Sequence, residues 1–72
     1  MTNEEKDKLY AQVLGLSGKI TKKDINKIYR NLIDKYHPDK VSHLGEEFQK
    51  FAHKKTKDIN KAYAYFKKKY KL

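Results

Sequence analysis

The stretch that decides the fold is residues 21–40, which read TKKDINKIYRNLIDKYHPDK. Thr21 and Asp24 have the spacing of a helix start signal, in which each side chain bonds the backbone amide of the other. Pro38 ends the helix because it has no amide to donate and disfavours helical backbone in the residue before it. The pattern therefore predicts a helix over about 22–36. Its apolar residues recur at the spacing of one buried face and are Ile25, Ile28, Tyr29, Leu32, Ile33 and Tyr36.

A second and longer helical pattern follows the proline. Two glutamates suit its first turn and three consecutive lysines its last turn, because the backbone dipole favours that order of charge. We predict a helix over about 45–68, preceded by a loop at Pro38–Leu44 in which Ser42 is a candidate cap. Aromatic residues at helical spacing are usually core, so its apolar face is expected to be buried. That face comprises Phe48, Phe51, Ala52, Ile59, Ala62, Tyr63 and Phe66.

A shorter helix is predicted upstream, at about Asn3–Leu14. Thr2 and Glu5 fit a capping box at its start, and Gly15 supplies a residue that tolerates left-handed dihedrals just past its end. Its apolar stripe is short and consists of Leu9, Val13 and Leu14. Three tyrosines lie outside all of these stripes and have no predicted place: Tyr10, Tyr65 and Tyr70.

Together the patterns predict an all-α domain over residues 1–72. The short first helix packs on a long antiparallel pair, about 22–36 and 45–68, whose joining loop holds His37-Pro38-Asp39. A chain of 72 residues buries little surface, so its stability is modest and a deep substrate pocket is not expected. The sequence has no cysteine, which excludes disulfides, and its apolar runs are too short for a transmembrane segment.

The charge balance is strongly basic and uneven. Eighteen Lys and Arg against nine Asp and Glu give a formal net charge of +9. From Lys50 to the end there are nine lysines and one acid, Asp58. Such a surface favours an anionic partner, whether an acidic protein patch, nucleic acid or an anionic membrane, although lysines also simply solvate a helix face.

The chain resembles the J-domain (DnaJ-like) family over essentially its whole length. The resemblance rests on Tyr29-Arg30, on Lys35-Tyr36-His37-Pro38-Asp39-Lys40, on Tyr10-Ala11-Gln12-Val13-Leu14-Gly15-Leu16 and on Ile59-Asn60-Lys61-Ala62-Tyr63. The His-Pro-Asp tripeptide alone is a modest signal. Its position at the end of an apolar-periodic helix, before the loop to a longer one, makes the combination specific.

The resemblance implies a co-chaperone module that binds the ATPase domain of a DnaK-like Hsp70 near its interdomain linker and stimulates ATP hydrolysis. By the same resemblance, Asp39 pairs with an arginine of that partner, and Pro38 fixes the turn that presents it. His37 pairs with backbone or partner groups. An aspartate beside a helix C-terminus lies in an unfavourable dipole field, so a cation that pairs with it gains more than usual.

A basic face on the helix over about 22–36 is the second part of the implied binding surface. Lys27, Arg30 and Lys40 are the best candidates, together with Tyr29 from the motif. The other polar residues on this face or its flanks are Lys22, Lys23, Asn26 and Asn31. Asn26 and Asn31 depart from the family pattern, in which many members carry a basic residue, so contacts through them are in doubt.

Two further departures point to a subgroup. No fourth helix is apparent, and the stretch between Asp39 and Ile59 is longer than in the commonest members. Both features resemble membrane-anchored DnaJ-like proteins with a C-terminal J-domain, whose anchor would lie upstream. We expect a cytoplasmic monomer that has no specific nucleic-acid partner and makes no membrane contact through this segment.

Two alternatives belong to other classes of protein. A basic three-helix chain could be a nucleic-acid-binding domain, but the turn between two short helices and base-reading side chains at helical spacing are missing. His37, His43 and His53 could form a metal or hydrolytic site, but no convergent carboxylates or nucleophile accompany them. The resemblance therefore implies an activator rather than an enzyme, and we expect no metal or cofactor.

Overall fold

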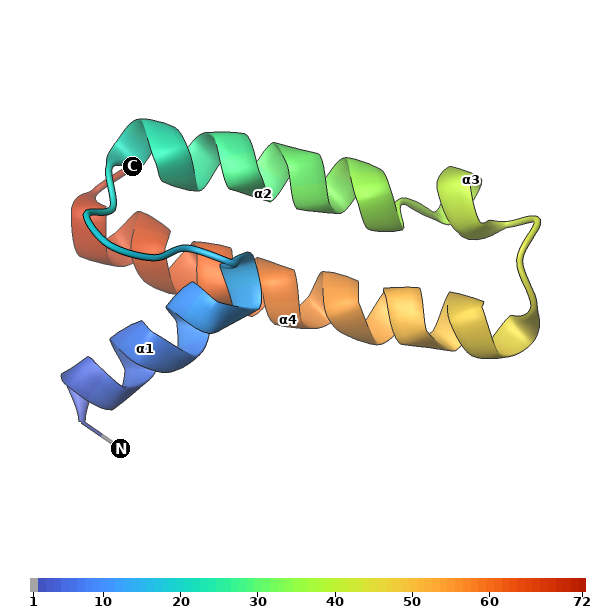
Figure 1. The fold of residues 1–72 in the computed structure, drawn as a ribbon, viewed down its shortest axis with the longest axis horizontal. Helices are drawn as coiled ribbons and strands as arrows, with labels where there is room; N and C mark the ends of the chain where they lie inside the picture. The colour runs from blue at the N-terminus through green and yellow to red at the C-terminus, as the bar shows by residue number, and fades with distance from the viewer. Residues whose placement is uncertain (1) are drawn as a thin grey trace.

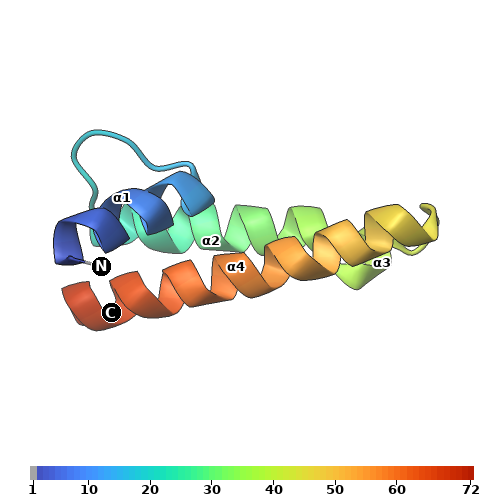
Figure 2. The ribbon, with the colours of Figure 1, turned by 90° about the horizontal axis from the view of Figure 1, so that it is seen from below.

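The computed structural model describes residues 2–72, and within them it contains four helices and no strand. They are α1 (Asn3–Leu14), α2 (Lys22–Tyr36), α3 (Pro38–Val41) and α4 (Glu46–Tyr70). Figure 1 shows α2 and α4 as an antiparallel pair along the long axis, with α3 at one end. Figure 2 places α1 beside the C-terminal half of α4, at the other end. The expected all-α architecture is confirmed.

The ends of α1 and α2 follow their sequence signals. At α2 the capping box is complete: the Thr21 hydroxyl accepts from the Asp24 amide at 3.1 Å, and the Asp24 carboxylate accepts from the Thr21 amide at 3.3 Å. At α1 the structure forms the Thr2 half of the expected box. Gly15 ends α1 at φ 72°, a conformation open to glycine without strain. These ends were predictable because capping depends on neighbouring residues only.

The segment between α2 and α4 was predicted wrongly as a loop throughout. Pro38–Val41 forms the one-turn helix α3, because Pro38 suits a first helical position and the His37 ring caps it. Ser42 does not cap α4; its hydroxyl donates to the Asp39 carbonyl at 3.2 Å. Gly45 occupies the cap of α4 and has no side chain that could make a capping bond.

The core lies where all three long helices meet. Its fully buried members are Leu14 from α1, Ile25 from α2, and Ile59, Ala62 and Phe66 from α4, each at most 1% exposed. The small side chain of Ala62 lies at the buried face of α4, as its place between Ile59 and Phe66 predicted. None of the helices in residues 2–72 is long and apolar enough to cross a membrane.

Two predicted core residues lie outside this core. Phe48 is 63% exposed and Phe51 is 51% exposed, so the expectation that both are buried is wrong. They belong to the first turns of α4, which extend past the end of α2 and beyond the reach of α1 (Figure 1). Phe51 packs edge-on against Tyr36, at 6.3 Å between ring centroids.

Two of the three unplaced tyrosines, Tyr10 and Tyr65, join α1 to the C-terminal half of α4. Tyr10 lies against Tyr65 with 4.9 Å between ring centroids, and Phe66 contacts both Tyr65 and Tyr70. Sequence patterns missed this cluster because α1 crosses α4 off its main apolar stripe.

A polar group lies beside this aromatic cluster. The Asp7 carboxylate accepts hydrogen bonds from the Lys69 ammonium and the Tyr65 hydroxyl. These two bonds hold the pKa of Asp7 below its usual value. The bond to Asp7 raises the pKa of Lys69, and the Tyr65 pKa rises because the neutral hydroxyl is the donor. The three groups therefore stabilise one another in the charge states of neutral pH.

Candidate functional site

The His-Pro-Asp tripeptide forms an exposed tip between α2 and α3. His37 Nδ1 accepts a hydrogen bond from the Asp39 amide at 3.2 Å, so the ring bonds backbone, one of the two pairings expected of it. In this arrangement the proton of a neutral ring lies on Nε2. The Asp39 side chain is 92% exposed, and its nearer oxygen lies 3.8 Å from the same ring nitrogen. The carboxylate is therefore held on a fixed turn and remains open to a cation.

The turn itself is anchored on both sides. Lys40 Nζ lies 3.8 Å from the Asp34 carboxylate, which ties α3 back to the last turn of α2. Gln49 of α4 donates from its side-chain amide to the carbonyls of Ser42 and Leu44, at 3.2 and 2.9 Å. The Gln49 contact could not be predicted, because it joins residues whose separation in space depends on α3.

Helix α3 alters the electrostatic field around Asp39. Asp39 was expected to sit in the unfavourable field of the α2 C-terminus alone. It instead lies in the first turn of α3, where a carboxylate is favoured. The two fields oppose each other, so the readiness of Asp39 to pair with a cation rests mainly on its exposure.

The predicted basic residues occupy the outer face of α2. Lys27 and Arg30 are exposed and line a shallow hollow that also includes Lys23, Asn26 and Asn31. Lys40 is separate from them, on α3 beside the tip. The structure thus places the seven sequence-predicted residues in three groups: the tip with Lys40, the α2 face, and Tyr29 at the α2–α4 contact.

Tyr29 takes part in a cross-brace between the two long helices. Its ring stacks on Tyr63 at 3.9 Å between centroids, with 13° between the planes. The Tyr29 hydroxyl donates to Asn60 at 2.8 Å, and the Tyr63 hydroxyl donates to Asn26 at 2.9 Å. Asn26, which departs from the expected basic pattern, therefore has a structural partner. The brace holds the basic face of α2 in a fixed position relative to α4.

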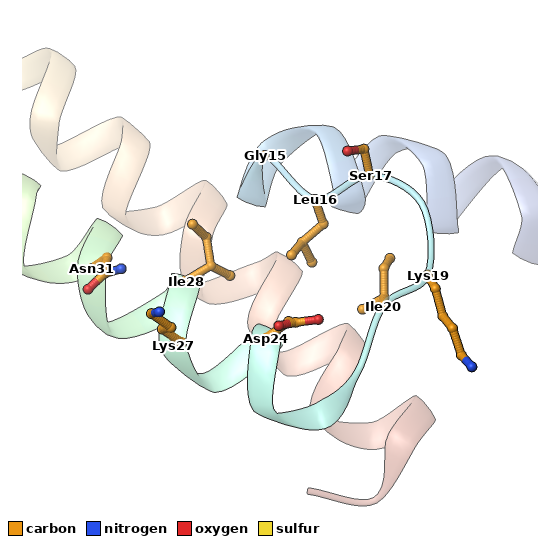
Figure 3. Close-up of a pocket in the computed structure, with 9 residues that line it drawn as sticks. All are labelled: Gly15, Leu16, Ser17, Lys19, Ile20, Asp24, Lys27, Ile28 and Asn31. Carbon is orange, nitrogen blue, oxygen red and sulfur yellow. The ribbon is translucent and has the colours of Figure 1, made fainter.

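Two hollows border these groups. One lies under the tip and is lined by Tyr36, Pro38, Val41, Ser42, Gln49, Ala52, His53 and Thr56. The other lies between the turn after α1 and the first half of α2 (Figure 3). There the apolar side chains of Leu16, Ile20 and Ile28 line the gap between the turn and α2, while Lys19 extends away from it (Figure 3). Lys27 lines this second hollow and joins it to the basic face.

The three histidines do not converge. His37 caps α3, His43 lies in the turn after α3, and His53 is on α4. Across residues 2–72, no cluster of three or more His, Asp or Glu side chains is placed to hold a metal ion.

Comparisons with known proteins agree with the motif. A family model described as "DnaJ domain" matches residues 8–71. Among curated proteins, the chain is 43% identical over 54 residues to "Chaperone protein DnaJ" of Fusobacterium nucleatum subsp. nucleatum, covering 75% of this chain and 14% of that protein. It is 42% identical over 59 residues to "Co-chaperone protein DjlA" of Coxiella burnetii, covering 79% of this chain and 22% of that protein.

A third relative comes from a eukaryote. The chain is 44% identical over 55 residues to "DnaJ homolog subfamily C member 7 homolog" of Dictyostelium discoideum, covering 76% of this chain and 10% of that protein. The chain thus corresponds to between 10% and 22% of the length of these three relatives. No solved structure matches it significantly.

Proposed function

The chain belongs to the DnaJ domain family, and on that premise we propose that it is a co-chaperone module that binds an Hsp70 and stimulates ATP hydrolysis by that partner. The observation that carries the proposal is the tip. Asp39 is 92% exposed on a turn fixed by Pro38 and by the His37 cap. A carboxylate already held in place pairs with an arginine without a large ordering penalty.

The basic face of α2 provides the second contact. Lys27 and Arg30 lie on the side of α2 away from α4 and make no ion pair within residues 2–72. Free cations of this kind attract an acidic surface and raise the rate of encounter, but each contributes little affinity because exposed charges are screened. Lys40 adds a further cation beside the tip. Tyr29 contributes through the exposed part of its ring and by bracing α2.

In this proposal the domain does no chemistry of its own. Binding at the tip and along α2 changes the ATPase rate of the partner through coupling between two sites on the Hsp70. The domain is thus an activator rather than an enzyme, and it needs no metal or cofactor. Its cytoplasmic location and monomeric state stay predictions.

The test is single-turnover ATP hydrolysis by a cognate Hsp70 with and without this chain. The proposal requires a faster rate that saturates with chain concentration. An unchanged rate at saturating chain, with a folded protein by circular dichroism, would contradict it.

Charge reversal separates the face from the tip. The pair Lys27→Glu and Arg30→Glu should weaken Hsp70 association mainly through a slower on-rate, and the loss should shrink as salt rises. A matched control is Lys67→Glu with Lys68→Glu, which makes the same charge change near the far end of α4. Equal binding by the two double variants would remove the α2 face from the interface.

A further inference from the structure

Along one flank, the long helix α4 has an aromatic residue four positions before a lysine at two places. Phe51 precedes Lys55 by four residues, and Tyr65 precedes Lys69 by four residues, so each aromatic ring shares a side of the helix with its lysine. Fourteen residues separate the two pairs, which is close to four full turns. Both pairs therefore lie on nearly the same flank of α4, about 21 Å apart.

The C-terminal pair is occupied by α1. The Tyr65 ring packs on Tyr10 at 4.9 Å between centroids, and the Lys69 ammonium binds the Asp7 carboxylate. The occupying helix has two acidic residues, Glu4 and Glu5, in its first turn. Its two contact residues, Asp7 and Tyr10, are three positions apart and so share one face. The pair Tyr65 and Lys69 thus binds a helix that presents a carboxylate and an aromatic ring three residues apart.

The N-terminal pair has no such occupant. Phe51 is 51% exposed, and its neighbour Phe48 is 63% exposed. Lys55 Nζ lies 5.6 Å from the centre of the Phe51 ring and pairs with no carboxylate in residues 2–72. Figures 1 and 2 both show that α1 covers only the C-terminal half of α4. Two exposed aromatic rings thus lie beside a cation that has no ion-pair partner in residues 2–72.

We propose that Phe48, Phe51 and Lys55 form a docking site for an amphipathic helix of a partner protein. The recognised helix presents a carboxylate to Lys55 and, three residues away, an aromatic or large apolar side chain to the two rings. The distance of about 21 Å along α4 leaves room for a helix about 10–12 Å across beside α1. The site is separate from Lys27 and Arg30, which point away from α4, so it stays open when that face is engaged.

Area and charge favour a partner segment over a second copy of the chain. Two rings that are roughly half exposed offer on the order of 200 Å², well below the 800 Å² or so that each subunit buries in a stable dimer. The chain also carries a net charge of +9, which opposes self-association. A short acidic helix from another protein is attracted by that charge, and weak, transient binding does not require an interface as large as a stable dimer.

A peptide with the sequence of residues 2–15 is a suitable probe, because its helix already binds the equivalent pair. We would titrate it into the isotopically labelled 72-residue chain and follow amide and aromatic signals by NMR. The proposal predicts saturable shifts at Phe48, Phe51 and Lys55, with a dissociation constant of about 0.1–1 mM, and unchanged signals at Tyr65. A peptide carrying Asp7→Lys should bind at least about fivefold more weakly.

A charge swap makes the test specific. Lys55→Glu should weaken binding of the normal peptide roughly fivefold and should restore binding of the Asp7→Lys peptide. Phe51→Ser should abolish binding of both. Lys57→Glu makes the same charge change elsewhere on α4 and should leave binding as in the parent. Circular dichroism would verify that each variant is folded.

The remaining outcomes overturn the proposal. The signals of Phe48, Phe51 and Lys55 could show no saturable shift. The peptide could instead displace α1 and shift only Tyr65 and Lys69. The charge swap could also fail to restore binding. Concentration-dependent self-association that Phe51→Ser removes would identify a second copy as the occupant. That result also contradicts a partner helix.

Discussion

The two halves of α4 both carry large apolar residues, but they differ in how far those residues are covered. In the C-terminal half, Ile59, Ala62 and Phe66 are at most 1% exposed between α1 and α2. In the N-terminal half, Phe48 and Phe51 lie at the same helical spacing but are more than half exposed. The difference shows that periodicity identifies which face of a helix is apolar but not how far along the helix that face is covered.

Helix length explains the contrast. The 25 residues of α4 run about 15 Å further than the 15 residues of α2, because each residue adds about 1.5 Å. The four-residue helix α3 covers part of that excess, and α1 lies at the other end. The C-terminal half therefore supplies most of the core, while the N-terminal half buries Ala52 but leaves Phe48 and Phe51 exposed.

The largest expected effect compares one phenylalanine from each half. Phe66→Ala should destabilise the domain by about 3–5 kcal/mol, because it removes a buried ring and leaves a cavity. Phe51→Ala should change stability by less than about 1 kcal/mol, because its ring is already half in water. Urea denaturation of both variants would measure the two values. Equal losses would mean that the N-terminal half is as much part of the core as the C-terminal half.

A smaller effect is expected from overfilling the contact between α2 and α4. Ala62 is fully buried, so Ala62→Leu should force neighbouring side chains apart and reduce stability by about 1–3 kcal/mol. Thermal melts would show the loss. Ala64→Leu is the matched control, because Ala64 is exposed on the same helix and should tolerate the change. Similar melting temperatures for the parent and Ala62→Leu would mean that Ala62 does not lie on the face of α4 that packs against α2.

The third effect depends on pH and concerns the link between α1 and α4. Lys69 and Tyr65 hold the pKa of Asp7 below its usual value of 3.8, so its bonds add stability that is present above that pH and lost as pH falls through the lower pKa. Asp7→Asn should therefore lower the melting temperature at pH 7. The gap between parent and variant should narrow below about pH 4. Glu4→Gln, in the exposed first turn, is the control. A gap that stays constant down to pH 2 would contradict the assignment.

Much of the fold could be predicted because its signals are local. The caps of α1 and α2, the stop at Pro38 and the buried face of Ile25 each depend on residues within a turn or two. The Tyr29–Asn60 and Tyr63–Asn26 bonds could not be predicted, because they join residues more than thirty positions apart. The exposure of Phe51 could not be predicted for a related reason, because it depends on where α1 lies relative to α4.

The tip was predictable as a motif, but its geometry was not. The tripeptide identified His37, Pro38 and Asp39. The hydrogen bond from the Asp39 amide to the His37 ring depends on helix α3, and a helix of four residues is too short to show an apolar period in the sequence. The exposed tip resembles the N-terminal half of α4 in one respect. Both present side chains that contribute little to stability, so substitutions there separate function from folding.

Asp39→Asn tests that separation most directly. The change removes the charge and keeps the size of a side chain that is 92% exposed, so stability should change by no more than about 0.5 kcal/mol. If Asp39 pairs with an arginine of the Hsp70, losing the charge should remove about 2–5 kcal/mol of binding or coupling. Single-turnover ATP hydrolysis by the Hsp70, measured beside a melting curve, should then show a folded variant that no longer stimulates. A folded Asp39→Asn chain that stimulates as well as the parent would contradict the proposed role of the tip.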